Sequence, residues 1–516
     1  MKPQSSAALD LLPQHTVAAV PDRLFGSFVE HLGRCVYGGI FEPGHPTADA
    51  DGLRRDVLEL TRELGVTVIR YPGGNFVSAY RWEDGVGPRD LRPRRLDPAW
   101  GVTETNQFGT DEFMTWCRAA GVEPMMAVNL GTRGMQDALD LLEYCNHPGG
   151  SALSDLRRAH GHTAPHNVRM WCLGNEMDSP WQAGHKTPVE YGRLASETAN
   201  AMRQFDPTLE LVLCGSCATW LPTYPEWDRI TLEHCYEQVD YLSLHRYLSL
   251  TDNNLRSFLY SAEFVETQLR DIIATCDHVK AKLRSKKTMR LSFDEWNVWN
   301  CGLGNPPGYT RWCEAPDQLA QIYTITDALV VAATLHSLLR HCDRVHAACL
   351  AQLVNVIAPM RAEAGGRAWR QTIFHPFALV ARHARGGRVI PQFASGPTEE
   401  VPEINHGQAV AVLDSVAVMN DATGVLTVFA LNRHASEALP LAINAPGSSG
   451  WKLLDHTELS HADPLAKNSA AAPANVTPKS APAQVRLADG AWQVVLPAAA
   501  WHVLRFQTAR HTSGCP

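Results

Sequence analysis

Two carboxylate residues, Glu176 and Glu295, each follow an apolar segment that ends in polar side chains. Residues 168–179 read VRMWCLGNEMDS, and residues 289–297 read MRLSFDEWN. One carboxyl group that carries a proton and a second that is ionised can together break a glycosidic bond. The first releases the leaving oxygen, and the second attacks the anomeric carbon or activates water. The two segments therefore raise the hypothesis of paired catalytic carboxylates.

Helix capping is the alternative interpretation of each segment taken alone, since Asp and Asn favour N-cap positions. Glu is a poor N-cap residue, however, and it occurs twice at the same depth after an apolar run. Further polar residues end these two runs and other apolar runs, and they include Glu30, His31, Arg70, Asn75, Asn129, Asn175, His245, Arg246, Tyr247, Asp294, Asn297, Gln352 and Asn355. Their convergence on one rim predicts a site for a ligand rich in hydroxyl groups.

Eight short apolar runs alternate with helix-like segments between about residues 25 and 355. The runs lie at residues 25–30, 66–72, 124–130, 168–176, 209–216, 239–247, 289–297 and 347–355. Several are continuously apolar, as is typical of parallel strands that are covered on both faces. The alternation predicts an α/β fold, a (β/α)8 TIM barrel whose active site lies at the carboxyl ends of the strands. A doubly wound open sheet is the alternative, but the Gly-rich phosphate loop that it often carries is absent after the first run.

Two segments between the runs show helical spacing. Residues 52–65 and 111–121 place apolar side chains on one helix face and close on Gly65 and Gly121. A glycine directly after the last helical turn is typical of a helix C-terminus. These segments are predicted to be helices on the outside of the barrel.

Beyond about residue 384 the pattern changes to short alternating runs separated by turn residues. The runs lie at residues 415–420, 424–433, 451–456, 492–497 and 501–506. They predict an antiparallel, jelly-roll-like β-sandwich, and the Ala-, Pro- and Ser-rich residues 459–484 are predicted to form a long loop. The predicted organisation is an N-terminal segment 1–20 that joins the sandwich, a catalytic barrel 21–383 and a sandwich domain 384–516.

Composition and charge exclude several classes of protein. The 516 residues are 45% hydrophobic and 19% charged, which allows a buried core and argues against disorder. The formal net charge of −8 argues against a nucleic-acid-binding protein. The sequence contains no run of 18 or more apolar residues, so no membrane span is predicted. The N-terminus lacks the pattern of a signal peptide, so a cytoplasmic location with the 13 cysteines reduced is predicted. Cys214 and Cys217 form a lone CxxC, which we interpret as two free thiols.

Four spaced motifs resemble those of the α-L-arabinofuranosidases of glycoside hydrolase family 51. They are RYPGGN, CLGNEMDSPWQ, SLHRY and DEWNVW, in the same order, and the similarity continues through residues 84–100 and 103–113. The resemblance implies a barrel with a β-sandwich and a reaction without a metal or other cofactor. It also implies a homo-oligomer with six subunits, a hexamer. It also implies retaining, exo-acting release of terminal α-L-arabinofuranosyl residues from arabinan, arabinoxylan or derived oligosaccharides. Residues 301–316, next to the expected arabinose position, match the family pattern less clearly.

The resemblance also implies roles for individual residues. Glu176 corresponds to the acid/base and Glu295 to the nucleophile, which is expected to be ionised and held by donors such as the Tyr247 hydroxyl. The implied substrate-binding residues are Glu30, Asn75, Asn175, His245, Tyr247 and Gln352. Beside these, Trp100 and Trp299 are predicted to contact the apolar face of a sugar, which further tryptophans such as Trp181 also fit. Arg70 has two interpretations, because it could hold Glu295 ionised or form a structural ion pair inside the barrel.

Other functions remain open from the residues alone. The same barrel and carboxylate pair would serve a β-glycanase or another furanosidase, for which internal cleavage rather than release of a monosaccharide would be the sign. A carbohydrate-binding protein without catalysis would bind sugar and not turn it over. A metalloenzyme is disfavoured because no HExxH or comparable ligand cluster occurs, so no metal ion is predicted.

Overall fold

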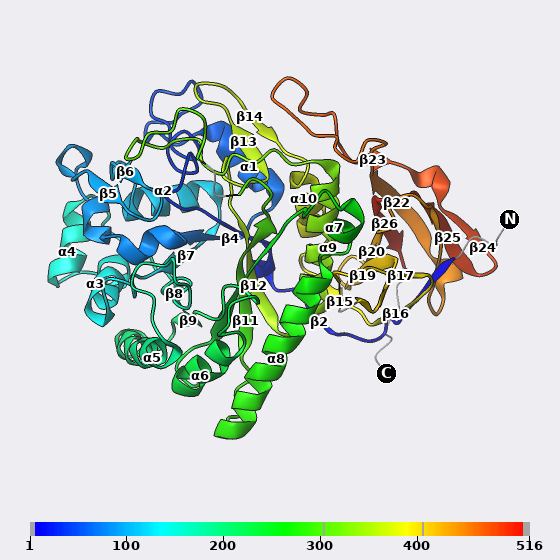
Figure 1. Ribbon diagram of the computed structural model, residues 1–516, viewed down its shortest axis with the longest axis horizontal. Coiled ribbons are helices and arrows are strands. Elements are labelled where there is room, and N and C mark those ends of the chain that lie inside the picture. The colour runs from blue at the N-terminus through cyan, green and yellow to red at the C-terminus, as the bar shows by residue number, and fades with distance from the viewer. Residues whose placement is uncertain (1–5, 303–304, 405–406, 509–516) are drawn as a thin grey trace.

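The computed structural model describes residues 6–302, 305–404 and 407–508. Eight parallel strands close into a barrel in the order β10-β11-β12-β3-β4-β7-β8-β9, on the left of Figure 1. The strands are β3 Gly26–Phe28, β4 Val68–Tyr71, β7 Glu123–Ala127, β8 Met170–Leu173, β9 Glu210–Leu213, β10 Tyr241–Leu248, β11 Arg290–Val298 and β12 Val345–Ala351. Each overlaps one of the eight predicted runs, so the predicted barrel is confirmed.

The barrel strands are apolar on both sides because both sides are packed. Inward-facing residues such as Phe28, Val68, Met125, Met170 and Val212 form one buried cluster. Outward-facing residues of the same strands belong to a second, larger cluster that they share with the surrounding helices. Trp171 on β8 is fully buried in this outer cluster.

Helices surround the barrel, as Figure 1 shows. They are α1 Arg55–Leu64, α2 Thr110–Ala120, α3 Met135–Asn146, α4 Ala152–Ala159, α5 Pro188–Phe205, α6 Glu226–Cys235, α7 Leu255–Leu259, α8 Glu263–Leu283, α9 Ile325–Arg340 and α10 Phe374–Ala384. The two predicted helix ends are confirmed: Gly65 follows α1 with φ +83° and Gly121 follows α2 with φ +77°, a conformation that glycine adopts without strain. None of the described helices is long and apolar enough to cross a membrane.

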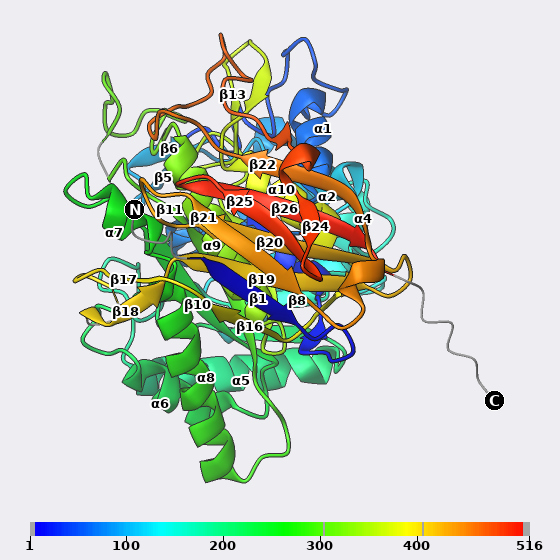
Figure 2. The ribbon, with the colours of Figure 1, turned by 90° about the vertical axis from the view of Figure 1, so that its right-hand side faces the viewer.

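Two sheets form the second domain, which faces the viewer in Figure 2. One sheet has the order β16-β1-β21-β25-β24 and the other β2-β15-β19-β20-β26-β22-β23, with an apolar core between them. The strands are β1 Ala7–Leu11, β2 Ala18–Ala19, β15 Arg388–Val389, β16 Gln392–Ser395, β19 Leu413–Asn420, β20 Val425–Asn432, β21 Leu439–Asn444, β22 Lys452–Leu459, β23 Lys479–Ser480, β24 Arg486–Ala488, β25 Ala491–Leu496 and β26 Ala500–Gln507. Three two-stranded pairs lie outside these sheets: β5 Arg95–Asp97 with β6 Val102–Glu104, β13 Met360–Ala362 with β14 Ala368–Arg370, and β17 Thr398–Glu400 with β18 Ala409–Ala411.

The sandwich departs from the prediction in two places. It is not entirely antiparallel, because β1 from the N-terminal segment pairs in parallel with β21 and antiparallel with β16. Residues 459–484 are not a continuous loop, because β23 lies within them and pairs with β22. The local pattern of a two-residue strand in an Ala- and Pro-rich segment is too short to be recognised. The predicted domain boundaries themselves stay a prediction.

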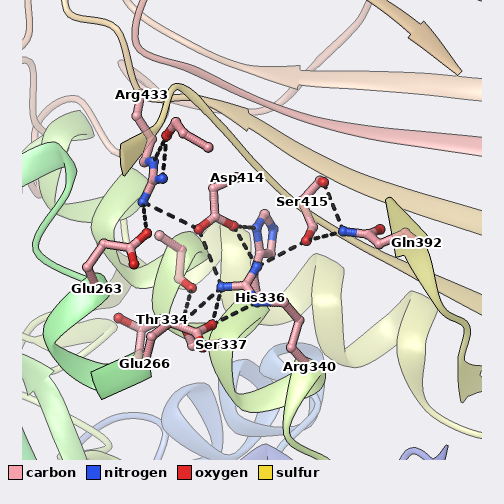
Figure 3. Close-up of polar contacts among 12 residues, drawn as sticks. Glu263, Glu266, Thr334, His336, Ser337, Arg340, Gln392, Asp414, Ser415 and Arg433 are labelled. Atoms are coloured by element: carbon pink, nitrogen blue, oxygen red, sulfur yellow. Dashed lines mark hydrogen bonds and ion pairs between the residues drawn. The ribbon is translucent and has the colours of Figure 1, made fainter. Parts of the chain in front are cut away.

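A buried network of charges joins the barrel to the sandwich (Figure 3). Asp414 on β19 accepts hydrogen bonds from His336 Nδ1 at 2.6 Å and from Arg340 Nη1 at 3.0 Å, both on α9. Trp501 Nε1 on β26 donates to His336 Nε2 at 3.0 Å, so the proton of a neutral His336 lies on Nδ1. Burial alone would raise the pKa of Asp414, yet the Arg340 charge and the His336 hydrogen bond hold it well below its usual range. The network therefore fixes the sandwich to α9 through an ionised, buried carboxylate.

Candidate active site

A cavity of about 850 Å³ opens at the carboxyl ends of the barrel strands. It is lined by eight of the predicted site residues, which are Glu30, Asn75, Trp100, Glu176, Tyr247, Glu295, Trp299 and Gln352. Three further predicted residues, Arg70, Asn175 and His245, are almost completely buried and contact the two lining carboxylates or each other. The structure therefore brings together the eleven side chains that were assigned individual roles, whereas His31, Asn129, Asn297 and Asn355, which were also expected at this rim, do not line the cavity.

Glu176 stands at the cavity wall on a strained piece of backbone. Its φ of +44° lies in the left-handed region, which residues other than glycine rarely adopt. Its Oε1 lies 2.8 Å from His245 Nδ1, and its Oε2 accepts a 3.2 Å hydrogen bond from Trp181 Nε1. Strain of this kind is retained where the surroundings determine the conformation, and it is concentrated at functional sites.

Glu295 lies on β11 directly beside His245 on β10, after an irregularity in the pairing of the two strands that shifts their register between Ser243 and His245. Its Oε1 accepts a 2.7 Å hydrogen bond from the Tyr247 hydroxyl, and its Oε2 accepts one of 2.9 Å from Arg70 Nη1. One carboxylate oxygen of Glu295 and one of Glu176 lie within 4.8 Å of each other. The two carboxylates thus face the same small volume.

The charges of this cluster oppose one another. Burial disfavours a charged His245, but the negative charges of Glu295, Asp294 and Glu176 outweigh it and raise the pKa of His245 to about 10. His245 is therefore an imidazolium at neutral pH. Burial raises the pKa of Glu295, while His245, Arg70 and the Tyr247 hydrogen bond act to lower it. The expected donors to Glu295 are present, but the opposing effect of burial was not predicted, because the sequence does not show how deeply this carboxyl is buried.

Arg70 contacts both the carboxylate and the amide that were predicted to be catalytic or substrate-binding. Besides Glu295, its Nη2 donates to Asn175 Oδ1 at 2.5 Å. Because that oxygen is engaged, Asn175 presents its Nδ2, a buried donor with no partner among the described residues. The Oε1 of Gln352 is a second buried polar atom of the site without such a partner. Unpaired buried groups beside a cavity are groups that a ligand can satisfy.

Glu30 forms a second acidic position across the cavity. Its Oε1 accepts 3.0 Å hydrogen bonds from Phe76 N and Trp100 Nε1, and its Oε2 accepts one of 3.0 Å from Gln352 Nε2. Burial, together with the negative charge of Glu295, raises the pKa of Glu30 to about 8. A protonated Glu30 can both donate to and accept from a ligand hydroxyl group.

Asp294 and Trp220 had not been assigned individual roles from the sequence, and Trp181 had been named only as a further tryptophan that fits the apolar face of a sugar. Asp294 lies beneath the cluster, where it accepts a 2.6 Å hydrogen bond from Ser243 and lies 3.2 Å from His245 Nε2. Its position next to Glu295 in DEWN was the available signal. Trp181 and Trp220 line the mouth of the cavity, 47% and 72% exposed, with ring centroids 5.7 Å apart. The sequence around Trp220 gives no indication of a role at the site.

The arrangement supports chemistry on a sugar. Two close carboxylates can supply the acid and the nucleophile of glycoside hydrolysis, while buried amide and carboxyl groups can bind hydroxyl groups. Trp299 lines the same cavity and contacts the edge of Tyr247, with ring centroids 5.1 Å apart at 78°. Exposed aromatic faces at the mouth suit the apolar faces of further sugar units.

Comparisons with known proteins agree with this chemistry. Residues 60–256 match the family model of the α-L-arabinofuranosidase 1 domain, and residues 294–500 match that of the α-L-arabinofuranosidase C-terminal domain. The chain is 54% identical over 476 residues to an intracellular exo-α-(1→5)-L-arabinofuranosidase of Streptomyces lividans, covering 92% of this chain and 71% of that protein. It is 51% identical over 468 residues to an exo-α-(1→6)-L-arabinofuranosidase of Bifidobacterium longum, covering 88% of each.

A solved structure shows the same architecture. The structure of a family 51 α-L-arabinofuranosidase from Bifidobacterium longum superimposes with a TM-score of 0.92 at 43% identity. The match covers 97% of this chain and 99% of that one, so it includes both the barrel and the sandwich.

Proposed function

Since the chain belongs to the α-L-arabinofuranosidases of glycoside hydrolase family 51, we propose that it cleaves by double displacement with Glu176 and Glu295. Its substrates are terminal α-L-arabinofuranosyl residues of arabinan, arabinoxylan or oligosaccharides derived from them. The observation that carries the mechanism is the separation of the two carboxylates. Oxygens within 4.8 Å fit the roughly 5–5.5 Å of retaining glycosidases better than the roughly 6.5–9.5 Å of inverting ones.

In the first step Glu295 attacks the anomeric carbon while Glu176 protonates the leaving oxygen. A covalent glycosyl-enzyme forms, and the aglycone leaves with the proton of Glu176. Tyr247 and Arg70 each hold one oxygen of Glu295, which fixes the carboxylate for attack. Arg70 thus both binds the nucleophile and forms a buried ion pair, so the two interpretations from the sequence are compatible.

In the second step Glu176 takes a proton from water as the water oxygen attacks the same anomeric carbon, and the bond to Glu295 breaks, which releases Glu295 as a carboxylate. Esterification of Glu295 has by then removed the negative charge beside Glu176, which leaves His245 and Trp181 as its polar partners. Arabinose is released with the configuration of the substrate, because two inversions at one carbon restore it.

Sugar recognition follows from the groups around the carboxylates. Asn175 Nδ2, which has no partner among the described residues, is positioned to donate to the sugar 2-hydroxyl, a bond that strengthens in the transition state. Glu30, Asn75 and Gln352 bind the remaining hydroxyl groups from the other side of the cavity. Trp100 and Trp299 contact apolar faces of the substrate.

Product analysis on a panel of aryl glycosides tests this function. We expect turnover of nitrophenyl α-L-arabinofuranoside, and proton NMR should show the α-anomer of arabinose before mutarotation. The rates of hydrolysis of α-1,5-linked and α-1,6-linked arabinobiose then show which of the two linkages in the relatives' names this protein prefers. Internal cleavage of a β-glucan or xylan without arabinose release, or initial formation of the β-anomer, would overturn the proposal.

Assembly and location are proposed from the same family membership. We propose a homo-oligomer, a hexamer, in the cytoplasm, in line with the relatives that are named intracellular. Light scattering coupled to size-exclusion chromatography measures the number of subunits directly. A monomeric mass for the active protein would contradict the proposed assembly.

A further inference from the structure

A second cluster of polar side chains lies outside the active-site cavity. Asp111 in the first turn of α2 meets His162 and His166, which belong to the segment between α4 and β8. His166 Nε2 lies 3.0 Å and His162 Nε2 3.8 Å from Asp111 Oδ1. The three ligand atoms all lie within 4.8 Å of one another. We propose that Asp111, His162 and His166 form a binding site for a divalent transition-metal ion, with Zn²⁺ as the favoured ion.

The spacing suits a tetrahedral ion. Zinc bonds of roughly 2.0–2.2 Å to nitrogen and oxygen place neighbouring ligand atoms about 3.4 Å apart. The two distances to Asp111 Oδ1, 3.0 and 3.8 Å, fall on either side of that value. A carboxylate with two imidazoles is a ligand set that zinc prefers over magnesium or calcium, which favour oxygen ligands.

The carboxylate is held in place from behind. Tyr144 on α3 donates a 2.7 Å hydrogen bond to Asp111 Oδ2, and its hydroxyl lies 3.0 Å from His160 Nδ1. Asp111 Oδ1 is thereby left facing the two histidines. Hydrogen bonds of this kind orient metal ligands and raise metal affinity.

A positive charge next to the cluster is compensated. The nearby guanidinium of Arg89 is paired with Glu112, which reduces repulsion of a cation.

Room for a further ligand adjoins the cluster. A cavity of about 100 Å³ is lined by Asp111 and His162 together with Glu112, Thr115 and Arg89 among others. This volume exceeds that of a single water molecule, so water can fill a fourth coordination position. The described residues that line the cavity of the proposed active site include none of the three ligands. The ion would therefore connect residues 162–166 to α2 and stabilise the barrel wall, without a part in hydrolysis.

The sequence carries a local signal for this site. Residues 160–166 read HGHTAPH, with three histidines in seven residues, and short His-rich tracts are typical of metal binding. The prediction of no metal ion rested on spacings within one helix or one motif. Asp111 is far from this tract along the chain and is brought to it only by the fold.

Titration of the full-length, metal-depleted protein with Co²⁺ and Zn²⁺ tests the proposal. We expect one equivalent of Co²⁺ to produce the visible absorption of a tetrahedral nitrogen and oxygen site, and one equivalent of Zn²⁺ to displace it. His162→Asn should abolish both signals and leave kcat/KM on nitrophenyl α-L-arabinofuranoside unchanged. His162→Cys restores a zinc ligand and should recover metal binding. That recovery would show that the loss of binding in His162→Asn is not due to misfolding.

Two further variants separate a metal site from a hydrogen-bonded cluster that binds no ion. Tyr144→Phe keeps all three ligands and should weaken Zn²⁺ binding about 10–100-fold through the lost hydrogen bond to Asp111. Glu295→Gln alters the cluster of Glu176, His245 and Glu295, whose ligand atoms also lie within 4.8 Å of one another, and should leave the Co²⁺ signal intact. The proposal is overturned if no stoichiometric binding occurs, or if binding survives His162→Asn and is lost in Glu295→Gln.

Discussion

Nδ1 of His245 lies 3.7 Å from Oε2 of Glu295, and the same nitrogen lies 2.8 Å from Oε1 of Glu176. One imidazolium therefore contacts both carboxylates of the proposed mechanism. Its positive charge acts to lower the pKa of Glu295, against the effect of burial. The state of the nucleophile thus depends on a residue that does not react.

Replacement of His245 tests this dependence. In His245→Asn the positive charge is gone, so the pKa of Glu295 should rise and the acidic limb of the kcat/KM profile should move to higher pH. An opposite charge at this distance changes a carboxyl pKa by about 1–3 units, and we expect a shift of about one unit or more. His278→Asn, at an exposed position on α8, is the matched control and should leave the profile unchanged. An unmoved acidic limb in His245→Asn would show that His245 does not set the charge of Glu295.

Glu30 should make the protein less stable as pH rises. Its pKa is raised from 4.5 to about 8, so the folded state keeps a proton that the unfolded state loses above pH 4.5. The contribution of this group to the free energy of unfolding is therefore full below pH 4.5 and is lost as pH rises through 8. Glu30→Gln cannot ionise, and its melting temperature at pH 8 should exceed that of the unmodified protein by about 2 °C.

The same comparison at pH 4.5 should show a smaller difference. At both pH values kcat/KM should fall in Glu30→Gln, because the new side chain places an amide nitrogen where a carboxylate oxygen accepts a hydrogen bond from Gln352. Differential scanning fluorimetry from pH 4.5 to 8 measures the effect on stability. Glu59→Gln, at an exposed position on α1, controls for the loss of one negative charge. A difference that does not grow with pH would mean that Glu30 is ionised in the folded protein.

Asp414 should be essential for the stability of the interface in Figure 3. Asp414→Asn leaves Arg340 and Arg433 without this buried carboxylate, and loss of one partner of a buried ion pair costs about 3–5 kcal/mol. Asp421→Asn is the matched control, because the Asp421 carboxylate pairs with Arg388 at the surface and its side chain is 62% exposed. This substitution should lower the free energy of unfolding by less than about 1 kcal/mol. Equal stability of the two variants in urea unfolding would contradict the role of the network.

Acid should weaken the same interface. The pKa of Asp414 is below its ordinary value of 3.8, so its contribution is complete above pH 3.8 and is lost as pH falls toward the folded value. Burial lowers the pKa of His336 below 6.5, so protonation of the unfolded chain begins near pH 6.5 and adds to the loss. Asp414→Asn keeps His336, so unfolding midpoints of the unmodified protein should fall more steeply than those of the variant only below pH 3.8, where Asp414 itself titrates. Parallel pH dependences in the two proteins would show that this interface does not set the acid sensitivity.

Glu295→Ala tests the nucleophile. Turnover should fall by several orders of magnitude on every arabinofuranoside, since no glycosyl-enzyme can form. Glu314→Ala changes an exposed carboxylate that pairs with Arg94 and should remain close to the unmodified protein. Substantial residual activity of Glu295→Ala with retained configuration would assign the nucleophile to another residue.

The barrel and most of its rim could be predicted from the sequence because both have local signals. Each barrel strand is a short apolar run, and residues such as Asn175 and Glu176 follow such a run directly. The parallel pairing of β1 with β21 had no such signal, because the two strands are separated by nearly the whole chain. The upward shift in the pKa of Glu295 was missed for a related reason, since burial depends on the packing of all eight strands.

Azide rescue of Glu176→Ala tests the proposed mechanism most directly, because the mechanism gives one residue two different roles. Loss of the acid should slow release of a sugar far more than release of nitrophenolate, which needs little protonation. Loss of the base should let glycosyl-enzyme accumulate with the nitrophenyl substrate. Azide, which needs no base, should then restore turnover and give an arabinofuranosyl azide of the same anomeric configuration as the substrate. Equal slowing of all leaving groups, with no effect of azide, would make Glu176 a binding or structural residue.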